Sequence, residues 1–81
     1  MTPAVRQMLN EAEGWTEVRA GSSRKLKDGR ALVIIEDVTG VVAGLQHSHK
    51  GFARFNKNLD GVKQALEFSD CLARLYGGWA E

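Results

Sequence analysis

The segment 50–55 alternates basic or aromatic side chains with small or apolar ones. In a β-strand, Lys50, Phe52 and Arg54 point to one face, because successive side chains point to opposite faces. Cations bind phosphate groups, and an exposed ring stacks on bases at about 1–3 kcal/mol per base. This spacing predicts a platform for single-stranded nucleic acid. The residues expected to share it are Arg19, Lys25, Lys27, Lys50, Phe52 and Arg54, with Trp15 as a further candidate.

An alternative places the aromatic side chains in the core, because large aromatics are usually buried. In that arrangement the N-terminal helix covers Phe52 and Trp15, and the basic side chains lie at the rim. The side of the sheet on which the N-terminal helix packs distinguishes the two arrangements.

The segment 23–30 brings four cations around an Asp28-Gly29 turn, a strong hairpin signal because these residues tolerate positive φ. Such a finger can dock in a nucleic-acid groove or on an acidic protein surface. Lysines on an edge strand also prevent edge-to-edge aggregation, which is the alternative. The four cations are Arg24, Lys25, Lys27 and Arg30.

Metal binding, thiol chemistry and catalysis have weaker support in the sequence. His47 and His49 could share a metal if the strand continued through them, but two ligands do not make a site. Cys71 has no base placed beside it and is interpreted as a buried or half-buried structural residue. The serines and glycines form no nucleophile elbow or phosphate loop. We expect no enzyme activity, metal or cofactor.

Charge is unevenly distributed. Residues 19–57 hold eight Lys or Arg against three Asp or Glu, whereas both flanking segments are mildly acidic and the whole chain is +1. A basic patch attracts polyanions or acidic protein surfaces. No apolar run approaches the roughly 20 residues that span a bilayer, and one cysteine fits a reducing compartment. We therefore expect no membrane contact and a cytoplasmic location.

The positioning elements follow from periodicity. Apolar spacing predicts a short helix at about 3–13, and a period of two predicts an antiparallel meander of four or five strands from 15 to 55. Asn58 is a good N-cap for a long C-terminal helix, which Gly77-Gly78 ends. The prediction is one α+β domain, 1–81, with the long helix packed on the sheet.

The apolar arc of that C-terminal helix is about 200° wide, more than one sheet can cover. Either the N-terminal helix packs alongside it or a second copy of the chain does. A chain of 81 residues is marginal alone and gains from association. We expect a homodimer, with Phe68 and Leu75 as contact residues.

Over residues 15–76 the order of elements resembles two groups of DNA-binding proteins. One is the transcriptional-coactivator family that binds single strands as a dimer of curved sheets. The other is the arm-type domains of tyrosine recombinases. The resemblance, in element order alone, implies DNA binding. The sequence favours a non-enzymatic nucleic-acid-binding domain, single strands preferred. The alternative is a small inhibitor or adaptor of phage or mobile-element type that blocks a host protein complex.

Overall fold

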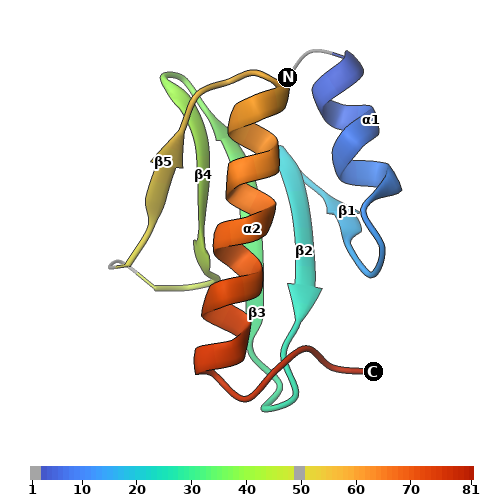
Figure 1. The fold of residues 1–81 in the computed structure, drawn as a ribbon, viewed down its shortest axis with the longest axis vertical. Helices are drawn as coiled ribbons and strands as arrows, with labels where there is room; N and C mark the ends of the chain where they lie inside the picture. Colours follow the sequence, from blue (N-terminus) through green and yellow to red (C-terminus); the bar gives the residue numbers. More distant parts are fainter. Residues whose placement is uncertain (1–2, 49–50) are drawn as a thin grey trace.

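The computed structural model describes residues 3–48 and 51–81. Within these residues, two helices and five strands follow one another (Figure 1). Their bounds are α1 Pro3–Glu11, β1 Thr16–Val18, β2 Gly21–Lys25, β3 Ala31–Asp37, β4 Gly40–Leu45, β5 Ala53–Phe55 and α2 Leu59–Leu75. The predicted α+β architecture is confirmed, and the meander has five strands.

The five strands form one antiparallel sheet in the order β1-β2-β3-β4-β5. The β2–β3 turn lies at the predicted Asp28-Gly29. The Leu26 amide donates to the Arg30 carbonyl, which closes a loop of three residues, and Gly29 has a φ of +94°. That value lies in the left-handed region that glycine enters at little cost.

The boundaries of α2 are set by the residues that the sequence singles out. The side chain of Asn58 accepts a hydrogen bond from the Gly61 amide at 2.7 Å. Gly77 and Gly78, with φ of +97° and +103°, end the helix. Both the N-cap and the glycine stop are therefore confirmed.

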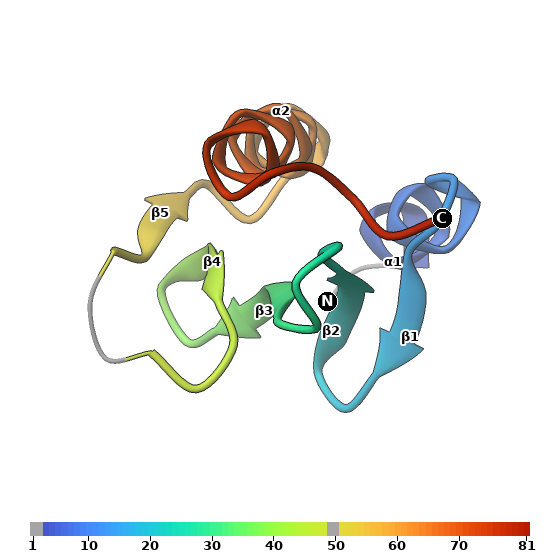
Figure 2. The ribbon, with the colours of Figure 1, turned by 90° about the horizontal axis from the view of Figure 1, so that it is seen from below.

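Both helices lie on the same side of the sheet (Figure 2). The helix α2 crosses β3, β4 and β5, and α1 lies beside it over β1 and β2. The main core forms between these layers from Val5, Leu9, Ile34, Val41, Ala43, Val62 and Ala65. The helix α1 thus packs alongside the wide apolar arc of α2, the first of the two arrangements expected.

The opposite side of the sheet is covered by neither helix, and we call it the open face. Strand alternation and the pairing register assign residues to it. They are Thr16, Val18, Gly21, Ser23, Lys25, Ala31, Val33, Ile35, Asp37, Gly40, Val42, Gly44, Phe52 and Arg54.

Neither helix in the described ranges, 3–48 and 51–81, has the length and apolar character needed to cross a membrane.

Candidate nucleic-acid interface

Phe52 lies on the open face, as its alternation with Arg54 predicts. A Cβ added to Gly44 would lie 2.5 Å from Phe52 Cδ1, so the ring rests on the backbone of β4 where there is no side chain. The residue is 39% exposed. The ring is thus supported by the sheet and still accessible from solvent.

Arg54 shares this face but is ion-paired. Its guanidinium donates to an Asp37 carboxylate oxygen and to the Thr39 hydroxyl. The hydrogen bond from Arg54, followed by one from the Val38 amide, holds the pKa of Asp37 below its ordinary value of 3.8. Within the folded chain, the positive charge of Arg54 is therefore matched by a carboxylate.

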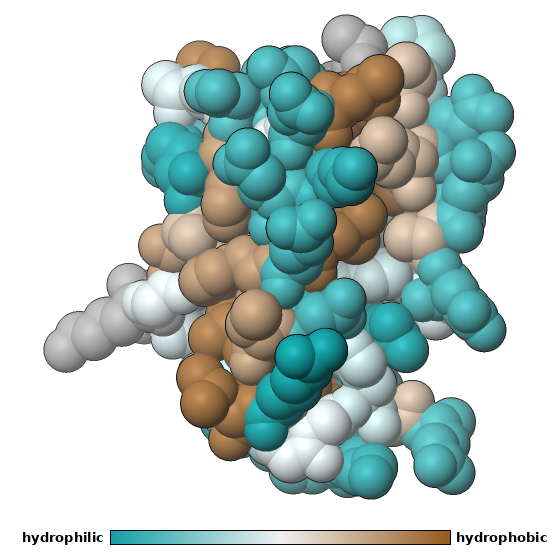
Figure 3. Space-filling model, in the orientation of Figure 1, coloured by the Kyte–Doolittle hydropathy of each residue, from teal (hydrophilic) through white to brown (hydrophobic). Residues whose placement is uncertain are grey.

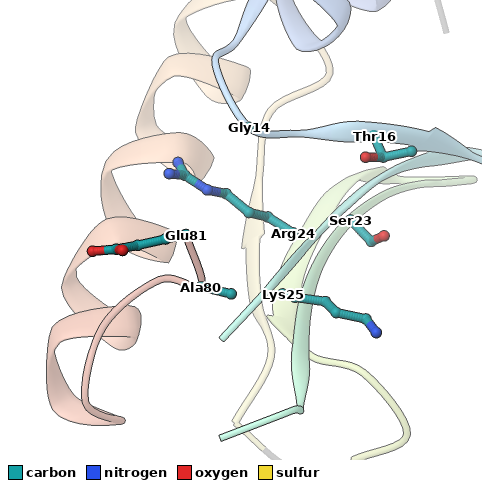
Figure 4. A pocket seen from close by; sticks show the side chains of 7 residues that line it. All are labelled: Gly14, Thr16, Ser23, Arg24, Lys25, Ala80 and Glu81. Carbon is teal, nitrogen blue, oxygen red and sulfur yellow. The ribbon is translucent and has the colours of Figure 1, made fainter. Parts of the chain in front are cut away.

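Lys25 lies on the open face near the other edge of the sheet. Thr16 and Ser23 face each other across β1 and β2, and Lys25 is the next residue of β2 on the same side. Figure 4 shows the side chains of Ser23 and Lys25 on the same side of β2, with Thr16 on the neighbouring strand. Among the residues that the structure describes, Lys25 has no carboxylate within ion-pairing distance. Thr16 and Ser23 were not predicted, because isolated hydroxyl residues give no periodic signal.

Arg24 points to the opposite side of β2 from Lys25 (Figure 4). Its guanidinium lies over the Trp79 ring, 4.4 Å from the centroid. Trp79 donates its indole N–H to Asp70 and contacts Trp15 edge-on, with centroids 5.4 Å apart. Trp15 is therefore packed on the helix-covered side, and its expected place on the exposed platform is wrong.

The two remaining cations of the 23–30 hairpin lie against the C-terminal segment. Arg30 hydrogen-bonds Asp28 and lies 4.7 Å from the Tyr76 ring centroid. The hydrogen bond from Arg30 lowers the pKa of Asp28 below its ordinary value of 3.8. Lys27 donates its amide to the Gly78 carbonyl at 3.1 Å. The hairpin is thus attached to the end of α2 and does not project as a free finger.

Arg19 and Lys50 complete the predicted set. Arg19 lies in the β1–β2 turn, beside Ala20, whose carbonyl accepts from the Glu36 amide. It therefore lies at the end of the sheet away from the 27–29 loop. Lys50 falls outside the described residues. The predicted cations thus occupy several places, and of those described only Lys25 and Arg54 share the open face with Phe52.

The predicted dimer contacts lie on α2. Phe68 packs against Phe55 within the chain, with ring centroids 5.7 Å apart. Leu75 is 80% exposed. Figure 3 shows apolar surface beside α2 and between the two helices. A shallow groove of about 470 Å³ between the helices is lined by Ala4, Gln7, Met8, Glu11, Ala12, Leu59 and Leu66.

The structure places two of the three candidate metal and thiol residues. Strand β4 ends at Leu45, and His47 has a φ of +66°, so the strand does not continue through His47 as the shared-metal geometry requires. His49 lies outside the described residues. Cys71 is exposed, contrary to the expected burial. In 3–48 and 51–81, no group of three His, Cys, Asp or Glu residues could hold a metal ion.

Comparison of the chain with protein-family models, with curated proteins and with solved structures finds no match.

Proposed function

We propose that this chain is a small, non-enzymatic domain that binds single-stranded nucleic acid across the open face of its sheet. The observation that supports the proposal is the placement of α1 beside α2. This packing leaves Phe52 accessible on the same face as Lys25 and Arg54. Bases then stack on the Phe52 ring while backbone phosphates meet the cations.

The ion pair between Arg54 and Asp37 does not prevent this use of Arg54. The two side chains are 53% and 40% exposed, and exposed ion pairs contribute about 0–1 kcal/mol. A phosphate can therefore take the place of Asp37 at small cost. Arg19 and Lys27, both exposed, add attraction at longer range.

Binding of labelled single-stranded and duplex DNA and RNA, followed by fluorescence anisotropy over a range of salt concentrations, tests the proposal. We expect single strands to bind more tightly than duplex, with affinity falling steeply as salt rises. Phe52→Ala should cost about ten-fold in affinity, since stacking contributes about 1–3 kcal/mol. The double variant K25Q/R54Q should weaken binding further and flatten the salt dependence.

Lys63→Gln is the matched control for charge removal. Lys63 is exposed on α2, and in the described part of the chain it has no ion pair. Equal effects of K63Q and K25Q would mean non-specific attraction. Absence of binding to every nucleic acid at low salt would exclude the proposal.

A specific observation also favours a protein partner, the second candidate. Strand β3 is apolar on both faces from Ala31 to Ile35, a pattern typical of strands buried on both sides. Leu75 adds exposed apolar surface on the other side of the molecule. An inhibitor or adaptor that blocks a host complex would use such surfaces, and so would the homodimer that the sequence predicts.

Capture of the tagged chain from native host lysate distinguishes the candidates. A stoichiometric protein partner that survives nuclease treatment supports the inhibitor or adaptor. Co-purifying nucleic acid, lost after nuclease treatment, supports the first proposal. Analytical ultracentrifugation of the purified chain tests the homodimer separately, and a mass of 8.9 kDa at all concentrations would exclude it.

A further inference from the structure

The outer edge of β2 is covered by two different segments. Strand β1 pairs with Gly21 to Ser23. Near the end of β2, the C-terminal segment 79–81 lies along the same edge. The Ala80 amide donates to the Lys25 carbonyl at 2.9 Å, and Leu26 forms an isolated β-bridge with Trp79. Between these two segments the outer edge has a gap at the Lys25 amide.

The amide of Lys25 is directed into this gap. In an antiparallel ladder the N–H and C=O of one residue point to the same neighbour, and successive residues alternate. The Leu26 amide donates to the Arg30 carbonyl, and the Glu36 amide donates to the Ala20 carbonyl. The backbone N–H and C=O groups of the even-numbered residues of β2 therefore point toward β3. The backbone N–H and C=O of Lys25 therefore point to the outer edge, in agreement with the hydrogen bond that its carbonyl accepts from Ala80.

The gap opens into a cavity of about 520 Å³ (Figure 4). Its lining residues are Gly14, Thr16, Ser23, Arg24, Lys25, Ala80 and Glu81. Thr16 and Ser23 are cross-strand partners, so their hydroxyl groups are neighbours, and the ammonium-bearing side chain of Lys25 leaves the same side. Hydroxyl groups, lysine and backbone amides are the groups that proteins use to contact phosphate.

Negative charge within this cavity comes from Glu81 alone among its lining residues. In Figure 4 the Glu81 side chain extends on the side of β2 where Arg24 lies, away from Thr16, Ser23 and Lys25. The side of the gap that joins the open face therefore carries donors and a positive charge.

We infer that Thr16, Ser23 and Lys25 form a binding site for one backbone phosphodiester of a single-stranded nucleic acid. The inference rests on the proposed function and extends it, because it fixes where the strand crosses the sheet. Ser23 pairs with Val33, and Val33 pairs with Gly44, on which the Phe52 ring lies. Ser23 and the ring thus share one row across the strands and are two strand spacings, or about 10 Å, apart.

The two chemical components of the site are tested by different readouts on a labelled oligothymidylate. The double variant T16V/S23A removes donors without removing charge, so we expect about ten-fold weaker binding with an unchanged salt slope. Lys25→Gln removes one charge, so the slope of log K against log salt should fall by about 0.7, the single-strand value for one phosphate contact.

Ser22→Ala is the control for the hydroxyl groups, because Ser22 is the neighbouring serine on the helix-covered side. It should leave affinity unchanged, and thermal melting checks that each variant folds. If the wild-type chain binds oligothymidylate but T16V/S23A binds equally well, or K25Q keeps the wild-type slope, the phosphate site is wrong while the proposed function stands. If the wild-type chain does not bind at all, both are wrong.

Discussion

The two faces of the sheet come from the same strands but differ in what covers them. Ile34 and Val41, which face the helices, are 0% exposed, whereas Ile35 and Val42 on the open face are only half-buried. Along β3 this change occurs between Ile34 and Ile35, whereas Val33, also on the open face, is buried. Alternation therefore separates two sets of side chains, and helix packing decides which set becomes the core.

The faces also differ in how charge is balanced. On the helix-covered side, Glu17 pairs with Arg6 of α1, and Glu36 pairs with Lys57 just before α2. On the open face, Arg54 finds its carboxylate within the sheet, and Lys25 is left without one among the described residues. The segments that cover one face thus also supply its counter-charges. On the uncovered face, the charge of Lys25 is not matched by a carboxylate of the described residues.

The largest expected effect comes from comparing Ile34→Ala with Ile35→Ala by chemical denaturation. Ile34 lies fully within the core, so its truncation leaves a cavity and should lower the free energy of unfolding by about 2–5 kcal/mol. Ile35→Ala should cost less, about 1 kcal/mol, because Ile35 is only partly buried and its truncation leaves no closed cavity. Equal losses would show that the open face is covered in solution, as a homodimer formed through this face would require.

A smaller effect is expected at Gly44, where the open face supports Phe52. Gly→Ala in a strand ordinarily gains about 0.5–1 kcal/mol. Here the new Cβ would meet the Phe52 ring at 2.5 Å, so we expect a net loss on the order of 1 kcal/mol as the ring is displaced. In a Phe52→Ala background the loss should disappear, which a double-mutant cycle measures. A loss that persists without the ring would contradict this packing.

The smallest effect is electrostatic. Because the pKa of Asp37 is lowered in the folded state, its contribution to stability is present above its ordinary value of 3.8 and is lost as pH falls through the folded value. NMR titration of the Asp37 carboxyl should show the lowered pKa, and Arg54→Gln should raise it. A titration unaffected by R54Q would show that the pair does not form in solution.

Much of the fold is predictable because its signals are local. The Asp28-Gly29 turn, the Asn58 cap and the Gly77-Gly78 stop each depend on residues adjacent in sequence. Alternation also places Lys25, Phe52 and Arg54 on one face correctly.

The candidate site is less predictable because its parts are distant in sequence. Trp15 and Arg24 contact Trp79, which lies more than fifty positions away in the sequence. No pattern in the first 30 residues predicts this contact. The proposed phosphate site depends equally on where β1 begins and on the C-terminal segment that lies beside the end of β2. Pairing of Arg54 with Asp37 likewise depends on their positions in the sheet.

The sequence by itself determined the elements, their order and the two alternating sets of side chains, since these follow from backbone preferences and short-range periodicity. Only the tertiary structure decided that α1 lies beside α2, that one face stays uncovered by the helices and that Arg54 is paired with Asp37. Those outcomes depend on burying the wide apolar arc of α2, which requires both the sheet and α1. Burial of that surface is a property of the whole chain.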